Sequence, residues 1–91
     1  MRILDLSAAF LRDRRIYSPH GSPHDSALRK ALNSLISSRV TLPLAGDEEA
    51  LRTPMITLWA HPVATTNLRI TYSIALPIVR VHALYPVWRA G

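Results

Sequence analysis

The chain has 91 residues and no cysteine, which predicts one small domain and excludes disulfides and thiolate metal sites. Apolar residues make up 48% and charged residues 19% of the chain, which is ordinary for a globular protein and argues against disorder. The formal net charge is +5, and every basic residue except Lys30 is an arginine. This balance indicates a polyanion or an acidic protein as partner, although a high-GC genome would also favour arginine.

The N-terminal segment predicts a strand followed by a short helix. Residues 2–6, "RILDL", are expected to form the strand, and Ser7 is placed to cap a helix that runs to about Ile16. The apolar run of this segment is broken by Asp5 and ends in charges, which does not match a signal peptide. No stretch reaches the roughly 20 apolar residues that span a bilayer. We therefore expect a soluble protein of the cytoplasm.

A second, longer helix is expected over residues 23–38. Ser22 is predicted as its N-cap, with Pro23 at the first helical position and Asp25 in the first turn. Apolar residues then recur at intervals of three and four and form one stripe. This stripe consists of Ala27, Leu28, Ala31, Leu32, Leu35 and Ile36.

The second half of the chain predicts a connection and three strands. The segment "TLPLAGDEEALRTP" is expected to be a loop, with a short helical turn possible at residues 48–52. Strands are expected at residues 55–61, 68–74 and 78–85, and their short links favour antiparallel neighbours. The sequence thus predicts a single α+β domain over residues 1–91, in the order β-α-α-β-β-β. Two helices would pack on one face of a small antiparallel sheet of three or four strands.

Period-two alternation assigns a set of polar and aromatic side chains to the other face of this sheet. The set comprises Thr57, Trp59, His61, Arg69, Thr71, Ser73, Arg80 and His82. On the last strand, Val79, Val81 and Ala83 are expected to point toward the helices. A one-sided antiparallel sheet carries polar residues outward in any case, and Arg80 has Glu48 or Glu49 as possible ion-pair partners.

The chemistry that best fits this face is metal-independent cleavage of RNA by its own 2′-hydroxyl. That reaction needs a base, an acid and a cation for the charge that develops on phosphorus. His61, His82 or Tyr85 would transfer protons, and Arg69, Arg80 or Arg89 would supply positive charge. Trp59 offers a plane on which a base can stack, although packing is its commoner use. The four histidines lack metal-ligand spacing, so neither a metal nor another cofactor is expected, and no serine nucleophile is indicated.

The element order and the stretch "RITYSI…PIVRVHALY" resemble the RelE/ParE superfamily of bacterial toxins. Members are small basic proteins that commonly carry an Arg-apolar-x-Tyr strand, a tight turn, an apolar strand and a basic or histidine-containing tail. "LRITY" at residues 68–72 matches the first part, and "IVRVHAL" at residues 78–84 matches the second. The segment "TLPL" resembles the YafQ-like branch in particular.

The resemblance implies a toxin of a type II toxin–antitoxin pair that cleaves mRNA on the ribosome and is neutralised by a cognate antitoxin. Arg69 corresponds to the arginine that RelE-type toxins use at the scissile phosphate, and Arg89 to their tail arginine. His82 or Tyr85 falls near the tail histidine or tyrosine, and His61 near a catalytic histidine of the YafQ-like branch. Asn67 stands where that branch has an aspartate. Two alternatives stay open, namely a ParE-like toxin directed at DNA gyrase and a non-catalytic basic module that binds an acidic protein.

Overall fold

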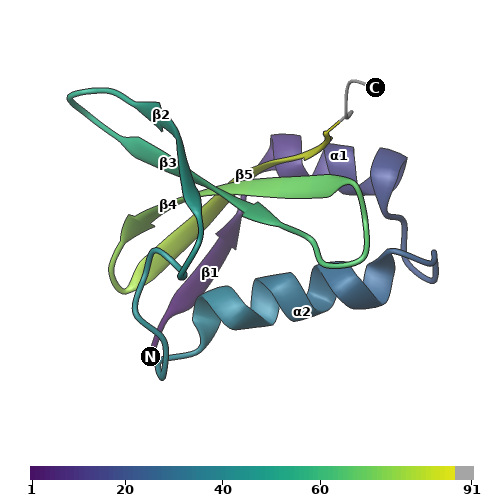
Figure 1. Ribbon diagram of the computed structural model, residues 1–91, viewed down its shortest axis with the longest axis horizontal. Helices are drawn as coiled ribbons and strands as arrows, with labels where there is room; N and C mark the ends of the chain where they lie inside the picture. The colour runs from purple at the N-terminus through teal and green to yellow at the C-terminus, as the bar shows by residue number, and fades with distance from the viewer. Residues whose placement is uncertain (88–91) are drawn as a thin grey trace.

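The computed structural model describes residues 1–87, which form two helices packed against a five-stranded mixed sheet (Figure 1). The strands are β1 (Ile3–Leu6), β2 (Glu48–Arg52), β3 (Thr57–Pro62), β4 (Leu68–Ala75) and β5 (Ile78–Pro86), and the helices are α1 (Ala8–Tyr17) and α2 (Asp25–Ile36). The strand order is β1-β5-β4-β3-β2. The strand β1 lies parallel to β5, and all other neighbours are antiparallel.

The α+β class, both helices and the last three strands are as predicted, but the purely antiparallel sheet of three or four strands is wrong. The sheet is mixed because the N-terminal strand pairs in parallel with the C-terminal one. It also has a fifth strand, β2, in the segment that was expected to be a loop with a helical turn. All five residues of β2 are exposed, so they carry no alternation that would mark a strand in the sequence. The β2–β3 hairpin projects from the body of the molecule (Figure 1).

The two helices begin in different ways. Ser7 caps α1 as expected, because its Oγ accepts a hydrogen bond from the Phe10 amide. Ser22 does not cap α2, which begins two residues later than predicted, after His24. Its first residue, Asp25, is buried and binds Arg14 of α1 through Oδ1, at 3.0 Å. This ion pair ties the start of α2 to α1.

One hydrophobic core lies between the helices and the sheet. Phe10 of α1 and the α2 stripe meet the inward side chains of β4 and β5, and most of these are completely buried. The cluster comprises Phe10, Leu28, Ala31, Leu32, Leu35, Val63, Leu68, Ile70, Tyr72, Val79, Val81 and Leu84. The α2 stripe is therefore confirmed except at its last position, since Ile36 is exposed.

A β-bulge at His82 changes which side chains of β5 point inward. Thr71 pairs with Ala83 and the next residue, Tyr72, pairs with Val81, so His82 has no partner of its own on β4. Leu84 therefore enters the core, and the expectation that Ala83 points inward is wrong. The helix α1 and its N-cap hold the bulge, because Ser7 Oγ donates to the His82 carbonyl and Asp13 Oδ2 accepts from the Leu84 amide. Without these two bonds, polar groups freed by the bulge would lack partners.

Candidate functional site

The outward side of the β4–β5 hairpin gathers the basic residues and forms the first candidate site. Arg69 lies directly opposite Tyr85, and Ser73 lies directly opposite Arg80. Opposite residues of an antiparallel pair point to the same side of the sheet, and His82 joins them through a hydrogen bond with Ser73. We call these five residues the basic face. The bulge places Tyr85 on it, because without the extra residue Tyr85 would be in phase with the inward side chains.

The two arginines of the basic face are only loosely paired. Arg69 Nη1 lies 3.9 Å from a carboxylate oxygen of Glu48 on β2, and Arg80 Nε lies 3.6 Å from Asp5 on β1. These distances exceed the 2.7–2.9 Å of a strong charge-assisted hydrogen bond. Both guanidinium groups are partly open to solvent, with 39% of the Arg69 side chain and 54% of the Arg80 side chain exposed. A bound anion can therefore displace the carboxylates at little cost.

His82 is the proton-transfer candidate on this face. Its Nε2 lies 2.8 Å from Ser73 Oγ. Desolvation by burial, and then the nearby positive charge of Arg80, lower the pKa of His82 below its ordinary value. The imidazole is thus neutral at physiological pH and able to accept a proton, which is the state that a general base requires.

Trp59 and His61 do not lie on the basic face, so their predicted grouping with its arginines is wrong. On β3, Trp59 pairs with Tyr72 and His61 pairs with Ile70, two residues that point into the core. Alternation along β3 places Thr57 on the same inward side. Trp59 packs against the hydrophobic core, which is the commoner use of such a residue.

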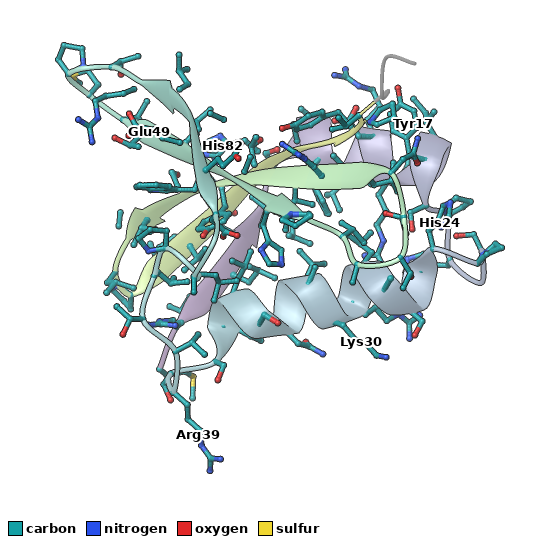
Figure 2. The ribbon with its side chains drawn as sticks, viewed as in Figure 1. Tyr17, His24, Lys30, Arg39, Glu49 and His82 are labelled. Carbon is teal, nitrogen blue, oxygen red and sulfur yellow. The ribbon has the colours of Figure 1, made fainter. Side chains whose placement is uncertain are left out.

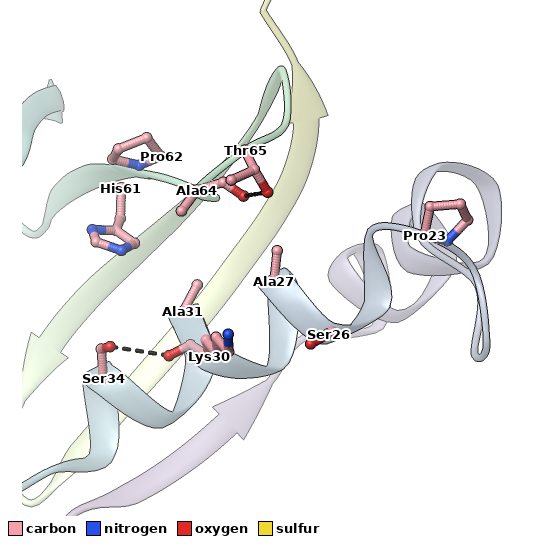
Figure 3. Close-up of a pocket in the computed structure, with 10 residues that line it drawn as sticks. All are labelled: Pro23, Ser26, Ala27, Lys30, Ala31, Ser34, His61, Pro62, Ala64 and Thr65. Carbon is pink, nitrogen blue, oxygen red and sulfur yellow. Dashed lines mark hydrogen bonds between the residues drawn. The ribbon is translucent and has the colours of Figure 1, made fainter.

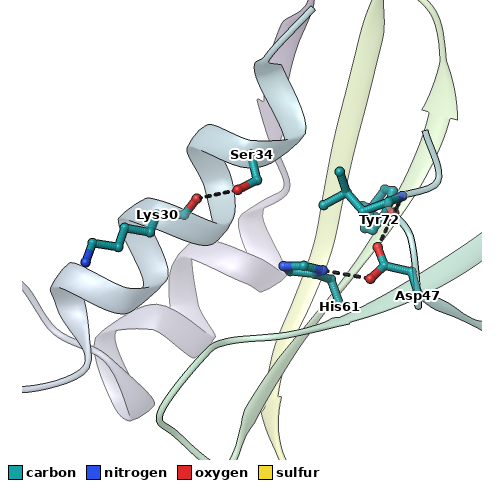
Figure 4. A network of polar contacts seen from close by, with 6 residues as sticks. Lys30, Ser34, Asp47, His61 and Tyr72 are labelled. Atoms are coloured by element: carbon teal, nitrogen blue, oxygen red, sulfur yellow. Dashed lines mark hydrogen bonds and ion pairs between the residues drawn. The ribbon is translucent and has the colours of Figure 1, made fainter. Parts of the chain in front are cut away.

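His61 instead belongs to a second polar cluster, on the helix side of the sheet (Figure 4). Its Nδ1 lies 2.7 Å from Oδ1 of Asp47, whose side chain is only 1% exposed. The other carboxylate oxygen of Asp47 accepts a hydrogen bond from the Tyr72 hydroxyl, and that hydroxyl accepts one from the Leu44 amide at 3.1 Å. We call Asp47, His61 and Tyr72 the carboxylate cluster.

His61 connects the carboxylate cluster to a groove between α2 and the end of β3, because its side chain lines one end of that groove (Figure 3). The groove has a volume of about 350 Å³. Its α2 wall is formed by small side chains and Lys30, and its opposite wall by His61 and the turn that follows β3. The lining residues are Pro23, Ser26, Ala27, Lys30, Ala31, Ser34, His61, Pro62, Ala64 and Thr65.

The sequence patterns do not reveal the carboxylate cluster. Asp47 opens an Asp-Glu-Glu run that is typical of a solvated loop, and only the fold shows that its first carboxylate is buried. One usable signal exists at Tyr72, which occupies an inward position of its strand. A buried tyrosine hydroxyl usually finds a hydrogen-bond partner, so a polar group was to be expected beside it. Arg89, the remaining predicted site residue, lies outside the described residues.

Comparisons with protein-family models, with curated proteins and with solved structures find no match for this chain. Within residues 1–87, no three His, Asp or Glu side chains converge in a way that would hold a metal ion. Neither α1 nor α2, the helices of this same range, is long and apolar enough to cross a membrane. The functional argument therefore depends on the chemistry of the two candidate sites.

Proposed function

We propose that this protein is a metal-independent endoribonuclease and acts as the toxin of a toxin–antitoxin pair, with the basic face as its active site. The observation that carries the proposal is the placement of Arg69, His82 and Tyr85 on one side of two adjacent strands. This set combines a phosphate-binding cation with two groups that can transfer protons. The resemblance of "RITYSI…PIVRVHALY" to the RelE/ParE toxins supports the same activity.

Each residue of the basic face has a role in the proposed reaction. Neutral His82 takes the proton of the RNA 2′-hydroxyl, whose oxygen then attacks phosphorus. The bond from phosphorus to the 5′-oxygen breaks, and Tyr85 donates the proton that this oxygen needs to leave. Arg69 binds the nonbridging phosphate oxygens and stabilises the charge that develops on them. The products are a 2′,3′-cyclic phosphate and a free 5′-hydroxyl, and no metal or water takes part in the cleavage.

Arg80 contributes affinity for RNA in this proposal. It lies across from Ser73, close enough to His82 for its charge to affect the histidine. A guanidinium at this position can bind a phosphate next to the one that is cleaved. Trp59 and His61 have no role on this face, since both point to the helix side of the sheet.

A second candidate function is binding of an acidic protein without catalysis. It is favoured by the carboxylates that already face both arginines, Glu48 at Arg69 and Asp5 at Arg80. A surface that holds its own carboxylates loosely can exchange them for those of a partner. An antitoxin and any other acidic partner would both bind by this exchange of carboxylates. Only RNA cleavage therefore distinguishes the toxin from a protein that merely binds a partner.

The test is cleavage of an end-labelled RNA by the purified full-length protein in EDTA, alone and with translating ribosomes. We expect cleavage that leaves cyclic phosphate ends and falls by about 10²–10³-fold in Arg69→Ala and 10²–10⁴-fold in His82→Gln. Arg39→Ala is the matched control, because it removes the same charge from an exposed site between α2 and β2. Intact RNA under both conditions would refute the endoribonuclease proposal.

Induced expression in cells separates the remaining alternatives. If mRNA is the target, incorporation of labelled amino acids should fall before incorporation of labelled thymidine. A gyrase-directed toxin should reverse this order and cause double-strand DNA breaks. A protein that only binds a partner should change neither rate. Arg69→Ala should relieve the arrest while the protein stays folded, as judged by circular dichroism.

A further inference from the structure

The hydrogen bonds of the carboxylate cluster determine where the protons lie. The Leu44 amide can only donate, so the Tyr72 hydroxyl accepts from it and uses its own hydrogen to bond Asp47. Burial, and then the bond with Asp47, raise the pKa of Tyr72, so the phenol keeps its proton at physiological pH. The Asp47 carboxylate thus accepts through both oxygens, from Tyr72 through one and from His61 through the other.

Because the Asp47 carboxylate can only accept, the hydrogen of the neutral His61 ring must be on Nδ1. The lone pair is then on Nε2, on the side of the ring that faces α2 across the groove (Figure 4). No hydrogen bond to Nε2 from residues 1–87 accompanies this arrangement. In the neutral form of the ring, the bond to Asp47 thus holds Nε2 of His61 toward the groove as a hydrogen-bond acceptor. Any ligand bound there must offer a hydrogen or a proton to this nitrogen.

The charge of the groove restricts the chemical class of the ligand further. Lys30 is the one lysine, arginine or acidic residue among the lining residues, and the Asp47 carboxylate is covered. Lys30 extends from the exposed side of α2 on a flexible stem (Figure 2), so its ammonium can turn toward a negative ligand at the rim. The hydroxyls of Ser26 and Ser34 lie on the same wall. A ligand suited to this groove is therefore negatively charged and also carries an acidic hydrogen.

We propose that the groove between α2 and the end of β3 is a second ligand site, which binds a phosphate monoester in its monoprotonated form. The P–O–H group donates to His61 Nε2, the negative oxygens attract Lys30, and the Ser26 hydroxyl completes the contacts, because the Ser34 hydroxyl already donates to the Lys30 carbonyl, at 3.0 Å. A phosphate monoester has its second pKa near 6, so this form is abundant at mildly acidic to neutral pH. Sulfate has a similar size and a larger negative charge but carries no hydrogen, and it should bind poorly. The volume of about 350 Å³ is at the lower end of ligand pockets, which span roughly 300–1,000 Å³.

This site is separate from the proposed active site. His61 pairs with Ile70 on the helix side of the sheet, whereas Arg69 points to the opposite side. The titratable groups around His61 come from three segments: Asp47 before β2 bonds His61 directly, Tyr72 on β4 bonds Asp47, and Lys30 on α2 lines the same groove. The inference does not depend on whether the protein cleaves RNA, and loss of Arg69 should leave it unaffected.

The test is ¹H–¹⁵N spectroscopy of the histidine rings during titration of the full-length protein near pH 6. Methyl phosphate is the probe, and sodium sulfate at equal ionic strength is the matched control. We expect methyl phosphate to shift the His61 ring nitrogens with saturation, and sulfate to shift them at least several-fold less. Wherever the His61 ring is neutral, it should show the Nδ1–H tautomer and not the Nε2–H tautomer. An equal response to sulfate, or no response at His61, would overturn the proposal.

Variants locate the binding and separate it from RNA cleavage. Lys30→Gln should weaken methyl phosphate binding several-fold, and His61→Gln should abolish the preference over sulfate. Both side chains are partly or fully exposed, so these variants are expected to fold. Arg69→Ala should bind methyl phosphate as the wild type does. Adenosine 5′-monophosphate, used as a second probe, shows which part of a ligand is recognised. Tighter binding than that of methyl phosphate would assign the site to nucleotides. Equal binding would show that only the phosphate group is recognised.

Discussion

Tyr72 combines two roles, because its ring fills the core while its hydroxyl connects two backbone segments. The hydroxyl joins the Leu44 amide to the Asp47 carboxylate, and the ring is completely buried. Tyr72→Phe keeps the ring but leaves the amide and one carboxylate oxygen without this partner. We expect the free energy of unfolding to fall by about 1–3 kcal/mol, as measured by urea denaturation. Tyr85→Phe is the control and should change stability by less than about 0.5 kcal/mol. Equal effects of the two variants would contradict the bonding described for Tyr72.

The raised pKa of Tyr72 predicts a loss of stability in alkali. The unfolded chain releases the phenolic proton near pH 10, whereas burial and the bond to Asp47 keep it on the folded protein to higher pH. Above about pH 10 the unfolded state therefore binds fewer protons than the folded state, and the free energy of unfolding decreases as pH rises. Urea denaturation at pH 8 and at pH 11 should show this decrease, and Tyr72→Phe should show a smaller one. An identical decrease in both proteins would exclude Tyr72 as its source.

His82 has the opposite dependence on pH. Its lowered pKa means that the unfolded chain binds a proton first, as the pH falls through about 6.5. The stability associated with neutral His82 is present above that pH and is lost progressively as pH falls through the lower pKa of the folded state. Wild-type protein should thus lose more stability between about pH 7 and pH 5 than His82→Gln does. A ¹H titration of the ring that gives a midpoint at or above the value for an unfolded peptide would contradict this assignment.

At the scale of the elements, hydrophobic periodicity correctly predicts the orientation of those helices and strands that carry a strong apolar pattern. The stripe of α2 and the alternation of β4 are correct because their large apolar side chains all point the same way. The strand β3 is ambiguous, since either set of alternating residues contains apolar side chains. Its phase is decided by the greater apolar area of Trp59, which packs beside Tyr72, while small Ala60 faces Thr71. No local sequence pattern shows which alternating set of β3 residues points toward the helices.

The bulge of β5 escapes prediction for a related reason. It is stabilised by Ser7 and Asp13, which are about 70 residues distant in the sequence. A regular alternation through Val81 and Ala83 looks complete without it, and only the long-range bonds from α1 show where the extra residue lies. The basic face was therefore predicted from the right strands, with Arg69, Arg80 and His82 correctly grouped, but with three residues of β3 wrongly included.

The helix starts provide a direct comparison of a capping serine with a similar serine that does not cap. Ser7 Oγ accepts from the Phe10 amide and donates to the His82 carbonyl, so Ser7→Ala should cost about 1–2 kcal/mol. Ser22 was predicted as a cap, yet its Oγ is buried without a partner among residues 1–87. Ser22→Ala should therefore leave the stability unchanged or raise it slightly. Thermal unfolding of both variants checks this, and a larger loss in Ser22→Ala would show that Ser22 caps α2 after all.

At the scale of the molecule, the sheet separates two surfaces of different chemistry. The basic face presents partly open guanidinium groups, the chemistry that the proposed binding of phosphodiesters by charge requires. The groove beside α2 combines one oriented histidine with one lysine, the chemistry on which the proposed binding of a protonated small ligand depends. Val63, Ile70 and the other core residues fill the space between sheet and helices, so variants on the two surfaces should act independently.

The net charge of +5 alone would give some affinity for RNA, so the contribution of the basic face must be measured by its salt dependence. Each phosphate that an arginine neutralises on single-stranded RNA adds about −0.7 to the slope of log K against log salt. Arg69→Ala and Arg80→Ala should each make the slope shallower by about 0.7, measured by fluorescence anisotropy with a labelled, non-cleavable 2′-O-methyl oligonucleotide. Arg39→Ala lowers the net charge by the same amount. Arg39 lies at the bottom of the view in Figure 2, far from His82 in the upper half, so this variant should leave the slope unchanged. If all three variants change the slope alike, RNA is attracted by overall charge and the basic face is not its binding site.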